Sequence, residues 1–315
     1  MANEIPEIRK FGVDISEHNG IINFEDLKDE VDFVMIRATY GRKGIDKMMK
    51  RNLEECKRLK IPFGFYLYSY ALNLDQAKEE VSFFLKTINE YKIDIQMPCV
   101  IDMEDGDGYK KKNGMPDNET LCDIVLYEAN QIAMAGMLPM CYASSSWFQS
   151  KLNNKKLDSL LKWIAWWNVE EEKIDKSKFS IWQNSSKKHV KGIDGNVDYN
   201  VAFQDFPAFI RYTTRYLKIV NIKENTGIED ITIQFFRLYK NGEELINKLY
   251  ERFKKPKIKK IEASETEKWQ IIMQEFELEL QDVEYLTKYL YNAALCIKLF
   301  NSILEGDQDG LGEWE

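Results

Sequence analysis

Short apolar runs recur between residues 11 and 202, with more polar segments between them. Eight runs have the length and the β-branched and aromatic content typical of strands: 11–16, 33–39, 62–71, 98–104, 138–144, 162–167, 179–183 and 196–202. Three intervening segments place apolar residues three or four positions apart, which predicts amphipathic helices over 46–60, 75–92 and 118–135. The last of these has a helix-start signal at Asn118, which Glu119 and Thr120 follow.

Alternating strands and helices predict right-handed βαβ units and a parallel sheet. Eight strands within this short stretch favour a closed barrel over an open sheet. The later connections, 168–178 and 184–195, are too short or too polar for full helices. We therefore predict an α/β fold: residues 1–210 form an irregular β/α (TIM-like) barrel.

Residues 211–315 follow a different pattern and predict a smaller C-terminal α+β module. Two strands are expected within 216–239 and a short helix over 242–253, and a long amphipathic helix spans about 262–304. Along it an apolar residue recurs every seven positions, at Trp269, Phe276, Val283, Leu290, Ile297 and Leu304. Such a stripe needs a partner, either residues 211–255 or another copy of the chain. Wall binding and homo-oligomerisation both remain open for this module.

Composition excludes several classes of protein. Hydrophobic residues make up 44% of the 315 residues, enough for a packed core, and the net charge of −8 disfavours a nucleic-acid partner. No apolar stretch is long enough for membrane insertion. Only two histidines, His18 and His189, and five scattered cysteines are present, so we expect no metal site and buried, reduced thiols. The N-terminal segment lacks an apolar signal-peptide core, so synthesis in a bacterial cytoplasm is expected.

A barrel carries its working residues at the carboxyl ends of its strands. Those ends hold ten polar or aromatic candidates: Asp14, Arg37, Tyr68, Tyr70, Asp102, Glu104, Tyr142, Trp166, Gln183 and Asp198. Asp102 and Glu104 form the sharpest pair, because residues i and i+2 of a strand share one face about 6.5–7 Å apart. Two such carboxyls repel, so one keeps its proton near neutrality, as cleavage of a glycosidic bond requires.

The same Asp-x-Glu tripeptide also occurs at solvated strand ends and at the start of metal loops. Asp14 and Asp198 strengthen the functional interpretation. They lie on the first and last strands, which are neighbours in a closed barrel. We therefore expect four carboxyls to meet at one rim.

Five motifs occur in a fixed order: GVDISEHNG (12–20), VIDME (100–104), WIAWW (163–167), IWQ (181–183) and NVDYN (196–200). With these motifs the chain resembles the glycoside hydrolase family 25 lysozymes, the Chalaropsis-type N-acetylmuramidases common among bacteriophage endolysins and bacterial autolysins. The resemblance covers roughly 11–205. It implies a glycoside hydrolase that cleaves the β-1,4 bond from N-acetylmuramic acid to N-acetylglucosamine in the peptidoglycan glycan strand, with no metal or organic cofactor.

Roles follow from the resemblance residue by residue. Glu104 matches the general acid/base and Asp102 its partner carboxylate, which either orients the substrate's 2-acetamido group or stabilises the cation directly. Asp14 and Asp198 match the flanking acids, expected to hold sugar hydroxyls and to raise the pKa of Glu104.

Aromatic side chains at the strand ends are candidates for stacking on the apolar faces of sugar rings: Tyr68, Tyr142 and Trp166. A core position is the alternative for each of them. Gln183 is expected to bind an N-acetyl group. Arg37 is either a structural ion-pair partner or a ligand for the substrate's carboxylate.

Two alternatives to a free endolysin-type muramidase stay open. One is a virion or tail structural component that binds or locally degrades the wall and assembles through the C-terminal helix. The other, a chitinase-like barrel, is disfavoured because its signature has an Asp where this chain has Val100. Release by a holin or delivery within a virion is expected. The segment 105–117, with three consecutive lysines, is expected to be a mobile, solvated loop.

Overall fold

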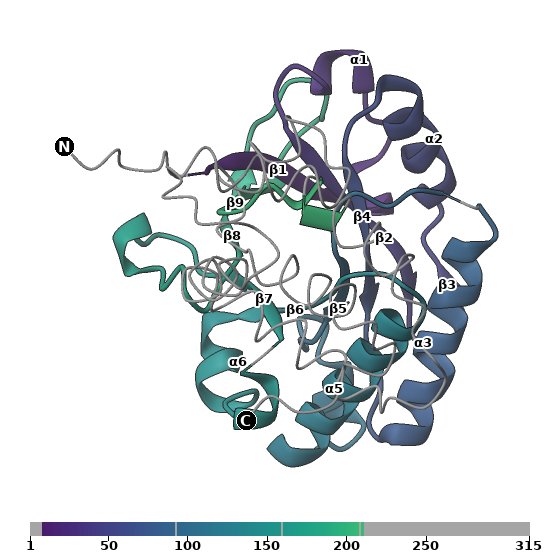
Figure 1. Cartoon of the computed structure of the whole chain (residues 1–315), viewed down its shortest axis with the longest axis vertical. Helices are drawn as coiled ribbons and strands as arrows, with labels where there is room; N and C mark the ends of the chain where they lie inside the picture. The colour runs from purple at the N-terminus through teal and green to yellow at the C-terminus, as the bar shows by residue number, and fades with distance from the viewer. Residues whose placement is uncertain (1–7, 92, 159, 208, 211–315) are drawn as a thin grey trace, which may run out of the picture. The chain divides into compact units, whose positions relative to one another are not determined.

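Eight strands close into a barrel in the computed structural model, which describes residues 8–91, 93–158, 160–207, 209 and 210. The strands are β1 (Lys10–Ile15), β2 (Phe33–Tyr40), β4 (Phe63–Tyr68), β5 (Cys99–Asp102), β6 (Pro139–Ser144), β7 (Leu161–Ala165), β8 (Ile181–Lys188) and β9 (Val197–Ala202). Their order is β1-β9-β8-β7-β6-β5-β4-β2, and parallel pairing of β1 with β2 closes the ring (Figure 1). All eight predicted strands are confirmed, as is the irregular β/α barrel.

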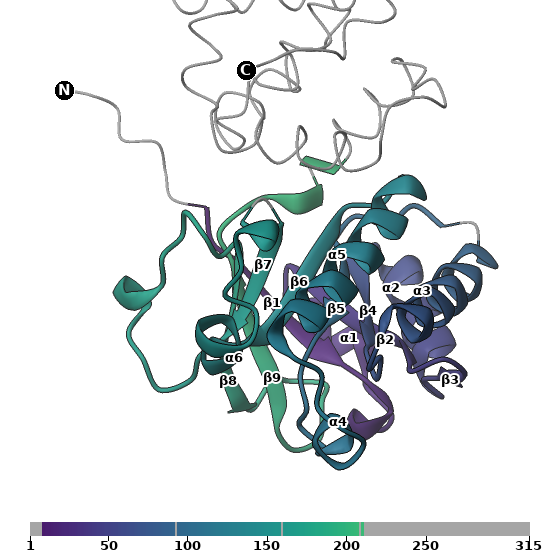
Figure 2. The ribbon, with the colours of Figure 1, turned by 90° about the horizontal axis from the view of Figure 1, so that it is seen from below.

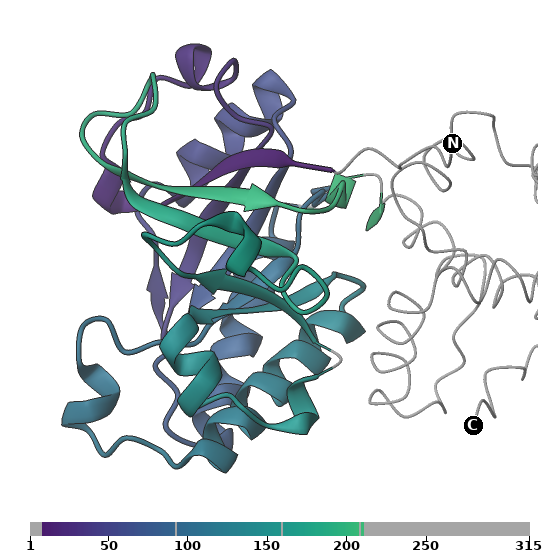
Figure 3. The same cartoon turned by 90° about the vertical axis from the view of Figure 1, so that its left-hand side faces the viewer.

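Strand β9 is the exception to the predicted parallel sheet. It runs antiparallel to both of its neighbours, β1 and β8, and Figure 3 shows it beside β1. The connection from Lys188 to Val197 is too short for a crossover helix, so the chain turns back as a hairpin. The start of β9 therefore lies at the rim where the other strands end. A short strand missed from the sequence, β3 (Gly44–Ile45), pairs with the end of β2.

The three predicted helices are confirmed as α2 (Met49–Leu59), α3 (Leu74–Asn89) and α5 (Asn118–Met134). Asp117 is the N-cap of α5 and accepts a hydrogen bond from the Thr120 amide, at 2.7 Å. Shorter helical segments were not predicted: α1 (Phe24–Leu27), α4 (Tyr109–Lys112), α6 (Ser145–Ser150), and the 3₁₀ turns η1 (Glu17–Asn19), η2 (Lys155–Leu157) and η3 (Glu171–Lys173).

The long helices cover only one part of the barrel wall. Helices α2, α3 and α5 pack on β2, β4, β5 and β6, and α3 lies beside α5 (Figures 1 and 2). Strands covered on both faces are mostly apolar, and all four residues of β5 are buried, including its last residue, Asp102. Figure 2 shows α4 set apart from α3 and α5.

The described unit runs from Arg9 to Ile210. The predictions for residues 211–315, including the α+β module and the helix over about 262–304, lie outside the described residues. Cys56, Cys99, Cys122 and Cys141 are buried free thiols, as expected, and Cys296 lies outside the described residues.

Candidate active site

One row of side chains crosses four strands at the carboxyl end of the barrel. The strand register pairs Tyr68 with Asp102, Asp102 with Tyr142, and Tyr142 with Trp163. Residues in one register row of a sheet point to the same face. Met103, between Asp102 and Glu104, is fully buried, which fits the predicted alternation that places the two carboxyls on the other face.

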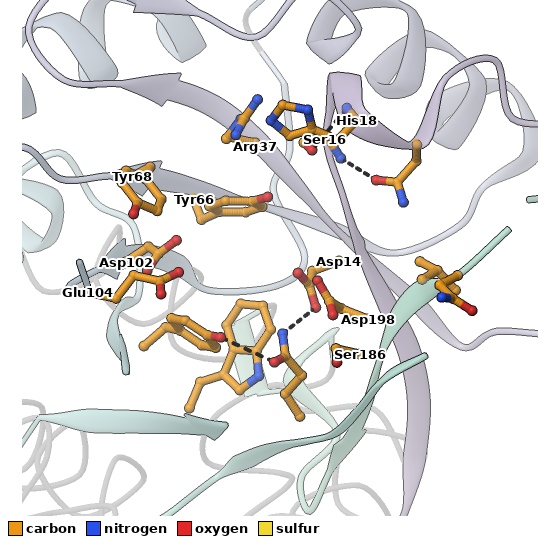
Figure 4. Close-up of a pocket in the computed structure, with 16 residues that line it drawn as sticks. Asp14, Ser16, His18, Arg37, Tyr66, Tyr68, Asp102, Glu104, Ser186 and Asp198 are labelled. Carbon is orange, nitrogen blue, oxygen red and sulfur yellow. Dashed lines mark hydrogen bonds between the residues drawn. The ribbon is translucent and has the colours of Figure 1, made fainter. Parts of the chain in front are cut away.

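A second pair of acids faces this row across a cavity of about 340 Å³. Asp14 of β1 and Asp198 of β9 are direct register partners. Figure 4 shows Asp102 and Glu104 on one side of the cavity, with Asp14 and Asp198 together on the other. The cavity is lined by Asp14, Ser16, His18, Asn19, Arg37, Tyr66, Tyr68, Asp102, Glu104, Tyr142, Trp163, Gln183, Ser186, Asn196, Val197 and Asp198. The structure thus brings together all four predicted acids.

Asp14 is held by two side-chain amides. Its Oδ2 accepts hydrogen bonds from Gln183 Nε2 at 3.0 Å and from Asn200 Nδ2 at 2.8 Å. The two amides are register partners on β8 and β9. Aromatic residues fix both of them: Trp163 Nε1 donates to Asn200 Oδ1, while Tyr142 Oη and Trp167 Nε1 both donate to Gln183 Oε1. Both polar atoms of the Gln183 amide therefore have partners within the protein, and its contact with an N-acetyl group stays a prediction.

Asp102 is buried with little hydrogen bonding. Its Oδ1 is buried and has no hydrogen-bond partner among the described residues. Leaving such an atom unpaired costs about 1–3 kcal/mol, a cost that suits a group whose partner is a substrate. Glu104 is less enclosed, and a Cβ added at Gly106 would lie 3.0 Å from its Oε2. A side chain at position 106 would therefore require the Glu104 carboxyl to move by a few tenths of an ångström.

Burial raises the pKa of all four acids above the ordinary carboxyl range. At Asp102, burial is the largest cause of the raised pKa and the charge of Glu104 is the second, while Lys110 opposes the change. Burial, followed by the charges of Asp14 and Glu104, raises the pKa of Asp198 to about 8. Hydrogen bonds from Asn200 and Gln183 counteract burial at Asp14 and favour its charged form.

The remaining predicted site residues divide into two groups. Tyr68, Tyr142, Gln183 and Arg37 line the cavity, whereas Trp166 is not among its lining residues and Trp163 stands there instead. Arg37 is ion-paired with Asp46 at 2.9 Å and with Glu17 at 3.3 Å, which matches the structural interpretation of this residue.

Three residues that line or support the site are among those that the sequence analysis missed. Asn200 lies two positions after Asp198 on the same strand face, and this period-two spacing was the available signal. Tyr66 lies two positions before Tyr68 and lines the cavity for the same reason. Asp46 carries no such signal, because its partner Arg37 lies on another strand.

The prediction for residues 105–117 is wrong in one respect. Residues 109–112 form α4, and Lys110 is completely buried, whereas Lys111 and Lys112 are exposed. Asp105 starts the turn by accepting hydrogen bonds from the amides of Lys110, at 2.6 Å, and Lys111, at 3.0 Å. Consecutive residues of a helical turn point in different directions, so three lysines in a row cannot all face solvent here.

Within the described part of the chain, no cluster of three or more His, Cys, Asp or Glu side chains is arranged to bind a metal ion. Among the same residues, no helix is both long and apolar enough to cross a membrane.

A family model, "Glycosyl hydrolases family 25", matches residues 13–193, more than half of the chain. The chain belongs to this family. It is therefore an enzyme, a glycoside hydrolase. Family 25 membership agrees with the resemblance found in the five motifs: the matched range contains VIDME, WIAWW and IWQ whole and all but the first residue of GVDISEHNG.

Similar solved structures include the modular autolysin LytC from Streptococcus pneumoniae in complex with a synthetic peptidoglycan ligand. It is 30% identical, with a TM-score of 0.56, over 61% of this chain and 46% of that chain. The match thus spans less than half of the pneumococcal protein. A family 25 glycosyl hydrolase from Bacillus anthracis, 20% identical with a TM-score of 0.55 over 65% of this chain and 93% of that chain, shares the fold. A curated relative is the uncharacterized protein YegX from Escherichia coli K12, 23% identical over 63% of this chain and 72% of its own length.

Proposed function

We propose that this family 25 hydrolase is an N-acetylmuramidase, which cleaves the β-1,4 bond between N-acetylmuramic acid and N-acetylglucosamine in peptidoglycan with net retention. The observation that carries the proposal is the meeting of Asp102 and Glu104 with Asp14 and Asp198 around one cavity. The autolysin LytC, whose structure holds a synthetic peptidoglycan ligand, supports the choice of substrate.

Glu104 is the general acid in this mechanism. Burial raises the pKa of its carboxyl, so the proton is available to the glycosidic oxygen as the bond from C1 to that oxygen breaks. Glu104, now a carboxylate, then takes a proton from the water that attacks C1. The same group acts twice, first as acid and then as base.

Asp102 stabilises the positive charge that develops at the sugar ring. It does so either directly or by orienting the substrate's 2-acetamido group, whose carbonyl oxygen then attacks C1. On the second route, attack by the acetamido oxygen and then by water inverts C1 twice and so gives net retention. On the first route, retention requires that water enters from the face that the leaving group has vacated. The unpartnered Oδ1 of Asp102 suits either role, because the substrate would supply its missing hydrogen bond.

The proposal includes the place of action: the enzyme cleaves the bacterial cell wall after it leaves the cytoplasm. It acts there either as a phage-type endolysin or as a virion-associated lysin. The shared fold of the CTP1L endolysin, 24% identical with a TM-score of 0.54 over 64% of this chain and 70% of that chain, is compatible with it. The alternative, a virion component assembled through the C-terminal helix, concerns residues outside the described part.

The test is digestion of purified Gram-positive peptidoglycan, with the released reducing ends identified by mass spectrometry. Products ending in reducing N-acetylmuramic acid are expected. Products ending in reducing N-acetylglucosamine, or no products, would reject the assignment.

A further inference from the structure

A buried lysine lies against the backbone of the carboxylate pair. Lys110 has no exposed surface, and its Nζ donates hydrogen bonds to the Ser69 carbonyl oxygen and, at 2.8 Å, to the Glu104 carbonyl oxygen. Ser69 directly follows strand β4, and Glu104 lies two residues after β5. One ammonium group therefore ties together the chain segments that leave two neighbouring strands of the active-site rim.

The same ammonium faces acids from several elements. The acids whose charges act on it are Asp102 of β5, Glu80 of α3, Glu128 of α5 and Asp105 of its own segment. Burial lowers the pKa of Lys110, and these carboxyls counteract that effect. Burying a cation is costly, and the carboxyls and the two carbonyl oxygens around Lys110 offset part of that cost.

Glu80 of α3 supports the turn at Ser69 and Tyr70, which follows strand β4. Its Oε2 accepts a hydrogen bond from Ser69 Oγ at 2.8 Å and its Oε1 accepts one from the Tyr70 amide at 2.9 Å. The Ser69 amide donates to the Asp102 carbonyl oxygen at 3.0 Å, so the turn is coupled to β5 as well. Glu128, by contrast, has two buried carboxyl oxygens without a hydrogen-bond partner among the described residues, and burial raises its pKa far above the usual range.

We infer that Lys110 is a positioning residue of the hydrolase: through its hydrogen bonds to the carbonyl oxygens of Ser69 and Glu104 it fixes the backbone that carries the Asp102–Glu104 pair, and it places a buried ammonium group beside that pair. This inference rests on the proposed function for its kinetic test. The other charged groups that act on the pair are Asp14 of β1, Arg37 of β2, and Asp105 and Asp107 of the following segment. Arg37 is already ion-paired with Asp46 and Glu17.

The first experiment compares Lys110→Met with Lys111→Met, a matched control at the neighbouring, exposed lysine, in the full-length protein. Loss of the cation disfavours the ionised carboxyls, so both limbs of the pH–rate profile of Lys110→Met should shift to higher pH, by about one pH unit. Its kcat should fall roughly 10- to 100-fold with KM changed less than about threefold, as expected for a misplaced catalytic group. Lys111→Met should behave as the wild type.

A double variant separates positioning from simple charge compensation. In Lys110→Met/Glu128→Gln the carboxyl of Glu128, which faces the lost cation, is replaced by a neutral group of nearly the same shape. If Lys110 positions the pair, the melting temperature recovers while kcat and the pH–rate profile stay altered. If kcat and the pH–rate profile return to wild-type values, Lys110 serves only to compensate the charge of acids on the helices, such as Glu128, and the inference is overturned. Failure of both variants to fold would make Lys110 a residue of the fold instead, and would also overturn it.

A titration of ¹³C-labelled Asp and Glu carboxyls by NMR gives a readout that does not require catalysis. The signals of Asp102 and Glu104 should titrate at higher pH in Lys110→Met than in the wild type. Unchanged titration overturns the inference about Lys110, whereas a wild-type protein that releases no reducing ends overturns the proposed function alone.

Discussion

The two walls of the active-site cavity hold their acids in opposite ways. On the β1–β9 wall, Asp14 accepts hydrogen bonds from two amides that cannot lose a proton, so the charged form is stabilised in place. On the β5 wall, Asp102 has a buried oxygen with no partner among the described residues, and the charge of Lys110 acts on it. Side-chain hydrogen bonds thus oppose the effect of burial on the pKa of Asp14, whereas nearby positive charge opposes it at Asp102.

The largest expected loss of activity comes from a substitution at Glu104, next to strand β5. Glu104→Gln removes the acid/base but keeps the shape of the side chain, so peptidoglycan cleavage should fall by about 10³-fold or more. Reducing-end release from purified cell walls measures this loss. Glu54→Gln, at an exposed position of α2, is the matched control. Activity within tenfold of the wild type in Glu104→Gln would mean that the acid lies elsewhere.

Asp102→Asn should have the next largest effect. The amide keeps the volume but cannot carry the negative charge that supports the ring cation, so kcat should fall by about 10²- to 10³-fold with little change in KM. Steady-state kinetics on soluble glycan strands measure both constants. A rise in KM without a fall in kcat would contradict the assigned role, because Asp102 would then serve ground-state binding.

Gln183→Met tests the donor-rich wall. The substitution removes one of the two donors to Asp14 and the acceptor of Tyr142 and Trp167. The pKa of Asp14 should rise further, and activity near neutral pH should fall about tenfold. A profile that regains activity at higher pH would agree with this cause. A loss that is the same at every pH would indicate misplacement of the aromatic side chains instead.

The smallest expected effect is that of Asp198 on the pH dependence of the free energy of unfolding. Its pKa is about 8 in the folded protein, whereas an unfolded Asp titrates near 3.9. The folded state therefore binds more protons between these values, and the free energy of unfolding should fall as pH rises from about 4 to about 8. Asp198→Asn should flatten this dependence and add about 1–2 kcal/mol at pH 8. Thermal denaturation across this pH range checks the prediction, and a slope equal to that of the wild type would contradict it.

Most of the fold could be predicted from the spacing of apolar residues along the sequence. The eight strands and three long helices follow from apolar spacing, because a barrel strand covered on both faces needs a continuous apolar run. Short segments such as α4 lack enough residues to show a period. The direction of β9 could not be predicted from the sequence, because parallel and antiparallel strands can have the same alternation of apolar and polar residues.

The four acids were predictable because each interrupts or ends an apolar run, where a charge is costly without a role. Trp166 and Trp163 illustrate the limit. Both belong to the WIAWW segment, yet only Trp163 lines the cavity, because it shares a register row with Tyr142, whereas Trp166 lies an odd number of positions further on, outside that row.

The sequence alone determined the barrel, its strands and the identity of the four carboxyl groups, because these depend on local spacing and on the cost of burying charge. Only the tertiary structure decided what surrounds each carboxyl. The amides on Asp14 and the lysine near Asp102 come from elements distant in the chain or from a turn too short to predict. Proton affinity depends on those neighbours within a few ångströms, and such distances exist only once the barrel has closed.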